Sequence, residues 1–485
     1  MTDQTIIETS PDTATRATKP AERQRLTGSL GVWGIVFIVV AAASPLGVIG
    51  GPVPLGIGLG NGAGLPTAFA VSTVILLLFA VGFTALTPYV PNAGAFYSYI
   101  GKGLGRVTGL GFAFVALISY LALEIGVYGL IGQGAKALVE SWGFPQLHWA
   151  VWALVAFAVV SVLGHRNIDL SRTVLGVLLI AEVAIVLVLD AVIVGKGGDH
   201  GLSTGFASIH TVLSGAPGIA LLFAILSFVG FEATAVFRDE ARDPDRTIPR
   251  ATYLSLGLIG VFYAVSTWAL LSGWGDDTAV AKAQSTPDTL LAQTTERYLG
   301  AVGGHIIQVL FVTSLFACIL SFHNIGSRYV FTLAQRSALP SHVGRPHQHH
   351  GSPHLASAAV SVVVGVFLII GVLADLDPVT QLYTWFAGVS TVGIVTLLLA
   401  TSIAVPLFFA RRRREGELTV PASRALVAPS LAVLGLTGVL ILILANLPSL
   451  VGDSTAIAVG VVALLAATFA AGAALAWQRP QIVVD

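Results

Sequence analysis

The chain has 485 residues, no formal net charge, 55% hydrophobic residues and only 10% charged residues, with a mean hydropathy of +0.85. This composition excludes an ordinary soluble protein, and the balanced charge gives no reason to expect nucleic-acid binding. Apolar runs of the length that crosses a bilayer, ~20 residues, recur along the whole sequence and predict a multi-pass membrane protein.

We predict an all-α fold with twelve membrane spans. They lie near residues 31–60, 66–88, 107–135, 147–164, 173–195, 214–237, 250–273, 301–333, 354–375, 379–409, 424–446 and 453–476. Residues 1–28 are polar and predict a disordered tail rather than a signal peptide, because no short apolar region with a small-residue cleavage site precedes the first span. Residues 479–485 predict a second short tail.

Basic residues set the expected orientation. All but four of the lysines and arginines lie in the first tail or follow an even-numbered span, and the four exceptions are Lys136, Lys196, Lys282 and Arg297. Loops rich in Lys and Arg stay in the cytoplasm, so both tails are expected on the cytoplasmic side of the cell membrane.

The first predicted span is unusual. Residues 41–61, AAASPLGVIGGPVPLGIGLGN, contain three prolines and six glycines. Irregular backbone at membrane depth is tolerated only where it is buried in protein or lines a cavity. We therefore predict two half-helices joined by an unwound LGVIGG segment, with a merely kinked helix as the alternative. Free amides in this segment would suit a substrate carboxylate, which makes these residues candidates for substrate binding: Gly47, Val48, Ile49, Gly50 and Gly51.

A weaker interruption lies five spans later, in residues 221–232, where Gly230 is the only glycine. Paired interruptions at corresponding positions predict two inverted repeats with the binding site between them. The repeats would cover residues 29–200 and 210–415, followed by two extra spans in 420–478. Free carbonyls of Ser227, Phe228, Gly230 and Phe231 would then suit an ammonium group.

Several stretches share one family likeness. They are FVGFEATAVFRDEARDPDRTIPRAT (228–252), PNAGAFYSYIGKGLGRVTG (91–109), SRYVFTLAQRSALP (327–340) and GVIGGP at the first interruption. Together they resemble the amino acid–polyamine–organocation permeases. The resemblance implies the fold of the bacterial leucine transporter, with two inverted five-helix repeats, broken spans one and six, and two extra helices. It also suggests that Phe231 closes over the substrate, although core packing would equally explain this residue.

Acidic residues within spans are functional candidates by default. Glu124 shares one helix face with Tyr120 and Tyr128, a polar stripe that either faces the cavity or bonds to another helix. Glu232 is expected to brace the second interruption. Glu182 lies mid-span, where some resembling permeases carry a lysine in place of a sodium ion; it would either carry a proton or form a static hydrogen bond.

Other candidates concern ions and gating. Thr313 and Ser314 are adjacent hydroxyls that could bind sodium. The loop 238–250 balances four arginines against four acids, including Glu240 and Arg250, and predicts either an inner-gate ion-pair network or a plain solvated loop. The single Cys318 gives no metal-type cysteine pair, and the histidines of 342–354 favour a solvated loop over a metal site, so no cofactor or metal is expected.

The sequence thus predicts a secondary transporter that moves amino acids by alternating access, coupled to protons by symport or working by exchange. A polyamine or amine transporter of the same fold is the alternative. A channel is less favoured, because no selectivity filter is present. An enzyme is not expected, since the sequence has no P-loop, HExxH motif or nucleophile elbow.

Overall fold

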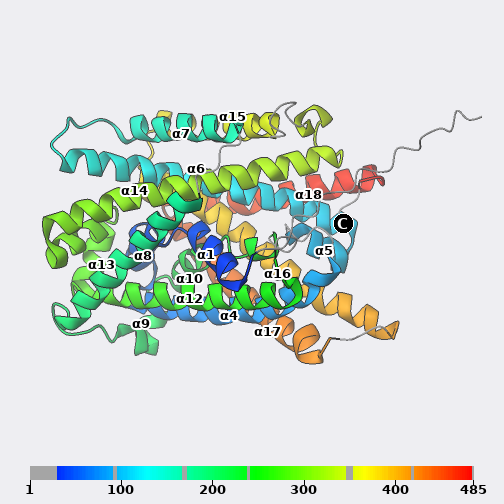
Figure 1. Cartoon of the computed structure of the whole chain (residues 1–485), viewed down its shortest axis with the longest axis horizontal. Coiled ribbons are helices and arrows are strands. Elements are labelled where there is room, and N and C mark those ends of the chain that lie inside the picture. The colour runs from blue at the N-terminus through cyan, green and yellow to red at the C-terminus, as the bar shows by residue number, and fades with distance from the viewer. Residues whose placement is uncertain are drawn as a thin grey trace, which may run out of the picture.

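The computed structural model describes residues 30–90, 96–166, 172–236, 241–345, 353–416 and 420–482. These ranges are nearly all helical, and most of the long helices run side by side along the long axis of the molecule (Figure 1). The longer helices are α1 (Val32–Ala42), α4 (Leu65–Leu86), α6 (Arg106–Ser141), α7 (Trp149–Arg166), α8 (Arg172–Gly195), α10 (Pro217–Leu226), α12 (Pro244–Ser272), α13 (Asp276–Ser285), α14 (Leu290–Gln335), α15 (His354–Leu373), α16 (Thr384–Arg414), α17 (Ala428–Leu450) and α18 (Thr455–Gln478).

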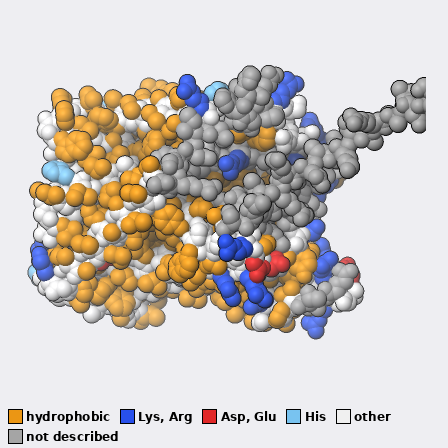
Figure 2. All heavy atoms as spheres, viewed as in Figure 1, with side chains coloured by type: hydrophobic (Ala, Val, Ile, Leu, Met, Phe, Trp, Pro, Cys, Tyr) orange, Lys and Arg blue, Asp and Glu red, His pale blue; other side chains and the backbone are white. Residues whose placement is uncertain are grey.

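The described part of the chain contains eleven helical stretches long and apolar enough to cross a membrane. Figure 2 shows hydrophobic side chains over most of the visible face, with Lys and Arg gathered mainly toward the end at which the C-terminus lies. An apolar belt between charged ends is the surface that a bilayer requires. The structure therefore agrees with a multi-pass membrane protein.

The first predicted span divides at a place other than the predicted one. Helix α1 ends at Ala42, and α2 (Pro45–Gly50) begins after Ser44, whose φ of 49° is left-handed. The LGVIGG segment predicted to be unwound is instead mostly helical, and a second irregular residue, Gly51, leads into α3 (Pro52–Leu55). Proline starts helices well at the first position and keeps the residue before it out of the helical region, so Pro45 sets the interruption at Ser44.

The sixth predicted span is also divided. Helix α10 has only ten residues, and α11 (Ala233–Val236) has four. Between them lies a series of turns in which Gly230 has a φ of 110°, a backbone conformation that other residues rarely adopt. Neither helix is long enough to cross a membrane alone, which is why eleven long spans are found rather than the predicted twelve.

Helix α6 lies at the centre of the bundle and packs against α7, α14, α16 and α18. Its glycines allow close contact with neighbouring backbone: a Cβ on Gly129 would lie 2.2 Å from the carbonyl oxygen of Pro378. Small residues at such crossings are the usual means by which membrane helices approach each other.

Gly129→Ala is therefore expected to destabilise the protein by about 1–3 kcal/mol, the usual range for overpacking a close contact. Gly257→Ala on α12 is the matched control, because a Cβ at Gly257 meets nothing within 4 Å. Thermal unfolding of the detergent-purified variants measures both effects. Equal stability of the two variants would contradict the close contact.

The chain before α1 is tied to the loop before α12. Leu30 and Ala241 form an isolated parallel bridge, and the backbone amide of Arg242 donates a 3.0 Å hydrogen bond to the carbonyl of Leu30. This main-chain contact joins the chain just before the first interrupted helix to the segment that follows the second.

Candidate functional site

A small cavity lies where the two interruptions meet. Its wall is formed by the region around Ser44, by the turn after α10, and by faces of α6 and α14. The lining residues are Ala42, Ala43, Ser44, Gly47, Val48, Pro52, Leu123, Val127, Leu130, Leu226, Ser227, Val229, Leu315, Cys318, Phe322 and Tyr383. Among these described residues the polar groups are hydroxyls, one thiol and main-chain atoms, and none has a charged side chain.

Polar contacts stabilise the interruption at Ser44. The Ser44 hydroxyl lies 2.7 Å from the hydroxyl of Ser314. It also donates a 3.2 Å hydrogen bond to the backbone carbonyl oxygen of Ser314. On the other side, the Tyr263 hydroxyl donates a 3.2 Å hydrogen bond to the carbonyl of Ala43. Backbone groups freed by a broken helix need such partners at membrane depth, so these contacts make the interruption possible.

Glu182 of α8 completes this network. Its carboxyl group is buried and accepts a 2.7 Å hydrogen bond from Ser314, and the backbone amide of Leu46 also donates to it. The amide of Gly47 lies 3.4 Å from the Ser314 hydroxyl. The two free amides of the first α2 turn, Leu46 and Gly47, thus meet protein oxygens. A chain of hydrogen bonds therefore runs from Glu182 through Ser314 to Ser44 at the cavity wall.

The two hydroxyls predicted as sodium ligands are used differently. Ser314 belongs to the network just described, whereas the Thr313 hydroxyl donates a 3.0 Å hydrogen bond to the carbonyl of Leu310 in its own helix. In this conformation the two hydroxyls therefore have separate protein partners.

Glu232 holds the second interruption in place. Its carboxylate accepts a 2.6 Å hydrogen bond from the Tyr120 hydroxyl and a 2.9 Å hydrogen bond from the backbone amide of Gly230. These contacts match the bracing role that we predict for Glu232. They also direct Tyr120 to the turn after α10 rather than to the cavity lining.

Glu124 lies away from the cavity lining, in a buried polar cluster between α6, α14 and α15. Its Oε1 lies 3.0 Å from Nδ1 of His323, and Nε2 of His323 lies 2.9 Å from the Ser357 hydroxyl. Both ionisable side chains are about 1% exposed. Of the two predicted alternatives for Glu124, the geometry fits a contact between helices rather than a substrate contact.

The remaining substrate-site candidates divide between the cavity and the packed interior. Gly47, Val48 and Ser227 line the cavity, whereas Ile49, Gly50, Gly51, Phe228, Gly230 and Phe231 do not. The ring of Phe228 packs against Tyr263, and that of Phe231 lies edge-on to Phe79 with 5.9 Å between centroids. Both aromatic side chains are thus core residues in this conformation.

The predicted inner gate is only partly described. Glu240 lies outside the described residues, as do residues 1–28 and His347, His349 and His350. Arg250 is an exposed residue of α12. The ion pair of this region that the structure describes joins Arg246 to Asp243 at 3.8 Å.

Sequence reasoning missed three polar residues of the cavity lining: Ser44, Cys318 and Tyr383. Ser44 had a usable signal, because a serine before a proline is a frequent helix start. Cys318 follows Ser314 by one helical turn and could have been placed on the same face. Tyr383 reaches its place through tertiary packing, which no local pattern reports.

Comparison with known proteins identifies the family. The amino acid permease profile matches residues 34–480, which is nearly the whole chain. The chain belongs to the amino acid permease family. Membership confirms the resemblance drawn from the sequence, and it confirms a transporter rather than an enzyme.

Several curated relatives are similar to this permease at low identity. The serine/threonine exchanger SteT of Bacillus subtilis is 24% identical over 72% of the chain and 76% of its own length. The low-affinity putrescine importer PlaP of Escherichia coli is 24% identical over 73% of the chain and 75% of its own length. A probable GABA permease of Pseudomonas aeruginosa is 26% identical over 78% of the chain and 79% of its own length. These relatives include carriers of amino acids and of an amine.

Proposed function

We propose that this permease carries an amino acid through the cavity by alternating access and couples its movement to a proton on Glu182. The observation that carries the proposal is the hydrogen-bond chain from Glu182 through Ser314 to Ser44. It connects a buried group that can bind one proton to the cavity wall. A proton and a substrate at these two places would each act on the same interruption of the helix.

The membrane topology forms part of the proposal. We take α10, the following turns and α11 as an interrupted sixth span, which gives twelve spans and two inverted repeats, 29–200 and 210–415, before the final pair. The charge distribution supports tails on the cytoplasmic side of the cell membrane. The first interrupted span, α4 and α10–α12 would rock together against α6, α7, α14 and α15.

The cavity chemistry favours an amino acid over a diamine. A zwitterion can be held by hydroxyls and main-chain groups, such as those of Ser44, Gly47 and Ser227, without a charged side chain. A diamine has two cationic ends and no carboxylate, so it would need acidic groups in the cavity. Three acids could have supplied one, and each already has protein partners: Glu124 pairs with His323, Glu232 accepts from Tyr120 and Gly230, and Glu182 accepts from Ser314.

The proton would act through Ser314. Ionised Glu182 holds the Ser314 hydroxyl and the Leu46 amide as donors. A proton on Glu182 would weaken both of these hydrogen bonds, because a neutral carboxyl group accepts weaker hydrogen bonds than a carboxylate. Protonation would therefore loosen α2 from α8 and α14, and its release would restore the contact.

Counterflow in proteoliposomes tests the proposal. Vesicles loaded with an unlabelled amino acid should accumulate the same labelled amino acid transiently, which a channel cannot do. Each amino acid is compared with its decarboxylated amine, and a thermal-shift screen with the same compounds reports binding by mass action. Stabilisation and counterflow with amines alone would overturn the amino-acid assignment.

A further inference from the structure

A second cavity lies beside the first, toward the α13–α14 connection. Its lining includes Gly50, Gly134, Asp288, Leu291, Gln308 and Phe311. These residues come from α2, α6 and the first half of α14, which are three of the elements that form the substrate cavity.

The two cavities are consecutive along these helices. Gly50 follows Gly47 by about one turn of α2, Gly134 follows Leu130 on α6, and Phe311 precedes Leu315 on α14. The same shift of one turn on three helices defines a path from the α13–α14 end of the bundle to the substrate cavity.

The ring of Phe311 lies in the second cavity, one helical turn from Leu315 of the first. A Cβ on Gly50 would lie 2.6 Å from this ring, and a Cβ on Gly134 would lie 2.9 Å from it. Two glycines, one on α2 and one on α6, thus leave a slot that the ring fills.

The polar side chains that line the second cavity are Asp288, Thr289 and Gln308, and they include two acceptors that face no cation within the described ranges. Asp288 accepts a 2.8 Å hydrogen bond from the Gln133 amide, and Oε1 of Gln308 is buried without a partner among the described residues. Lys136, the cation one turn from Gln133, faces Glu140 at 4.0 Å. A carboxylate and a free amide oxygen favour a cationic group such as a primary ammonium.

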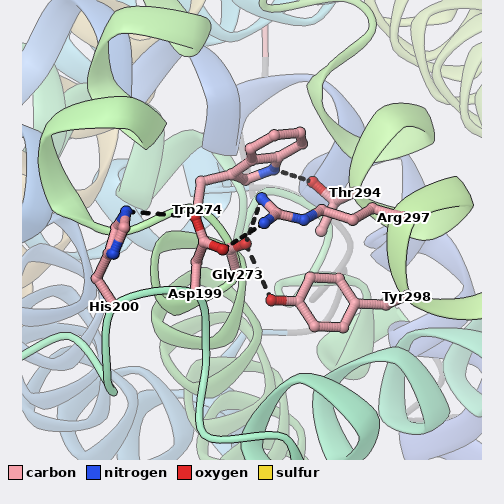
Figure 3. A network of polar contacts seen from close by, with 7 residues as sticks. All are labelled: Asp199, His200, Gly273, Trp274, Thr294, Arg297 and Tyr298. Atoms are coloured by element: carbon pink, nitrogen blue, oxygen red, sulfur yellow. Dashed lines mark hydrogen bonds and ion pairs between the residues drawn. The ribbon is translucent and has the colours of Figure 1, made fainter.

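A network of polar contacts surrounds the first turns of α14, the helix that follows Asp288 (Figure 3). Arg297 forms an ion pair with Asp199 and stacks over the Trp274 ring at 4.6 Å. The Trp274 indole donates a 2.7 Å hydrogen bond to Thr294, and the Tyr298 hydroxyl donates to the carbonyl of Gly273 at 3.0 Å. These contacts fasten the start of α14 to the residues just after α12. Leu291 and Ala292, from the first turn of the same helix, line the second cavity.

We propose that the second cavity is a staging site that binds the ammonium group of the incoming amino acid, and that Phe311 separates it from the substrate cavity. The inference rests on the proposed function and deepens it. Asp288 binds the ammonium group, Gln308 accepts a further hydrogen bond, and rotation of Phe311 admits the substrate.

Asp288→Asn tests the binding step. Uptake of labelled amino acid should show a KM raised by about tenfold, since a lost charge-assisted hydrogen bond of ~1.4 kcal/mol corresponds to that factor, with an unchanged maximal rate. Asp277→Asn, an exposed acid of α13, is the matched control and should leave KM unchanged. If Asp288→Asn unfolds, Gln308→Ala provides the same test.

Failure of this inference is distinct from failure of the proposed function. An unmodified protein that transports no amino acid would overturn the proposed function. Transport by the unmodified protein with equal KM values for Asp288→Asn and Asp277→Asn, or for Gln308→Ala and Asp277→Asn, would overturn the staging site alone.

Chemical labelling of Cys318 tests whether Phe311 separates the two cavities. It is the only cysteine of the chain and lines the substrate cavity, so a small cationic thiosulfonate reagent added outside reports access to that cavity. Phe311→Ala should raise the labelling rate by about tenfold, as expected for a barrier lowered by ~1.4 kcal/mol. Phe316→Ala, on the same helix but outside both cavity linings, should not. Equal labelling of the two variants would refute the partition.

Discussion

Glu182→Gln should abolish amino acid accumulation driven by a proton gradient while leaving exchange of labelled for unlabelled amino acid intact. Glutamine keeps the shape of the side chain and can still accept the hydrogen bond from Ser314, but it cannot bind and release a proton. For symport of one proton, a gradient of one pH unit supports about tenfold accumulation by the unmodified protein and about none by the variant, because one pH unit is worth ~1.4 kcal/mol.

Asp190→Asn is the matched control for that experiment. Asp190 lies on the same helix, is also buried, and accepts a 2.6 Å hydrogen bond from the Ser266 hydroxyl. Neither Asp190 nor Ser266 lines the cavity, whereas the Ser314 partner of Glu182 contacts Ser44 of the cavity wall. The control should retain accumulation. Gradient-driven uptake that survives in Glu182→Gln would remove Glu182 from the coupling mechanism. Loss of exchange as well would point to a structural role.

The second large effect is expected at the buried pair of Glu124 and His323. His323→Leu or Glu124→Leu alone should lower the free energy of unfolding by about 3–5 kcal/mol, because each leaves one buried ionisable group without its partner. The double variant should recover much of this loss, since both polar groups are then gone. Chemical unfolding in detergent completes the double-mutant cycle.

The same variants discriminate between the two interpretations of Glu124. If Glu124 only joins helices, folded variants keep the KM of the unmodified protein for every substrate. A selective loss of amine uptake in Glu124→Gln would return this residue to the substrate site. Additive losses of stability in the cycle would show that the two side chains do not act as a pair.

Composition and motifs were sufficient to predict an all-helical membrane permease. Apolar run length gave most of the spans, and the 228–252 stretch gave the family. The position of the first interruption was predicted wrongly, because six glycines drew attention to LGVIGG while Pro45 set the actual start of the helix. Glycine permits an irregular backbone, whereas proline imposes a restriction on the residue before it.

The candidate site was harder to predict because helix faces depend on rotation within the bundle. Tyr120, Glu124 and Tyr128 do share one face of α6, but that face meets α14, α15 and the turn after α10 rather than the cavity. The cavity is lined by the apolar residues Leu123 and Val127 of the same helix. A polar stripe on one helix does not tell whether that stripe faces a cavity or a neighbouring helix, because either can provide its polar partners.

The bridge between Leu30 and Ala241 is made entirely of backbone atoms, so its strength does not depend on which side chains these positions carry. Ordinary substitutions would leave it intact, and only a residue without an amide hydrogen, such as proline in place of Arg242, would remove the 3.0 Å hydrogen bond. The segments that flank the two interrupted helices are therefore joined by a backbone contact that tolerates almost any substitution at Leu30 and Ala241. The side chains on both sides of this bridge can therefore change without loss of the contact between the two segments.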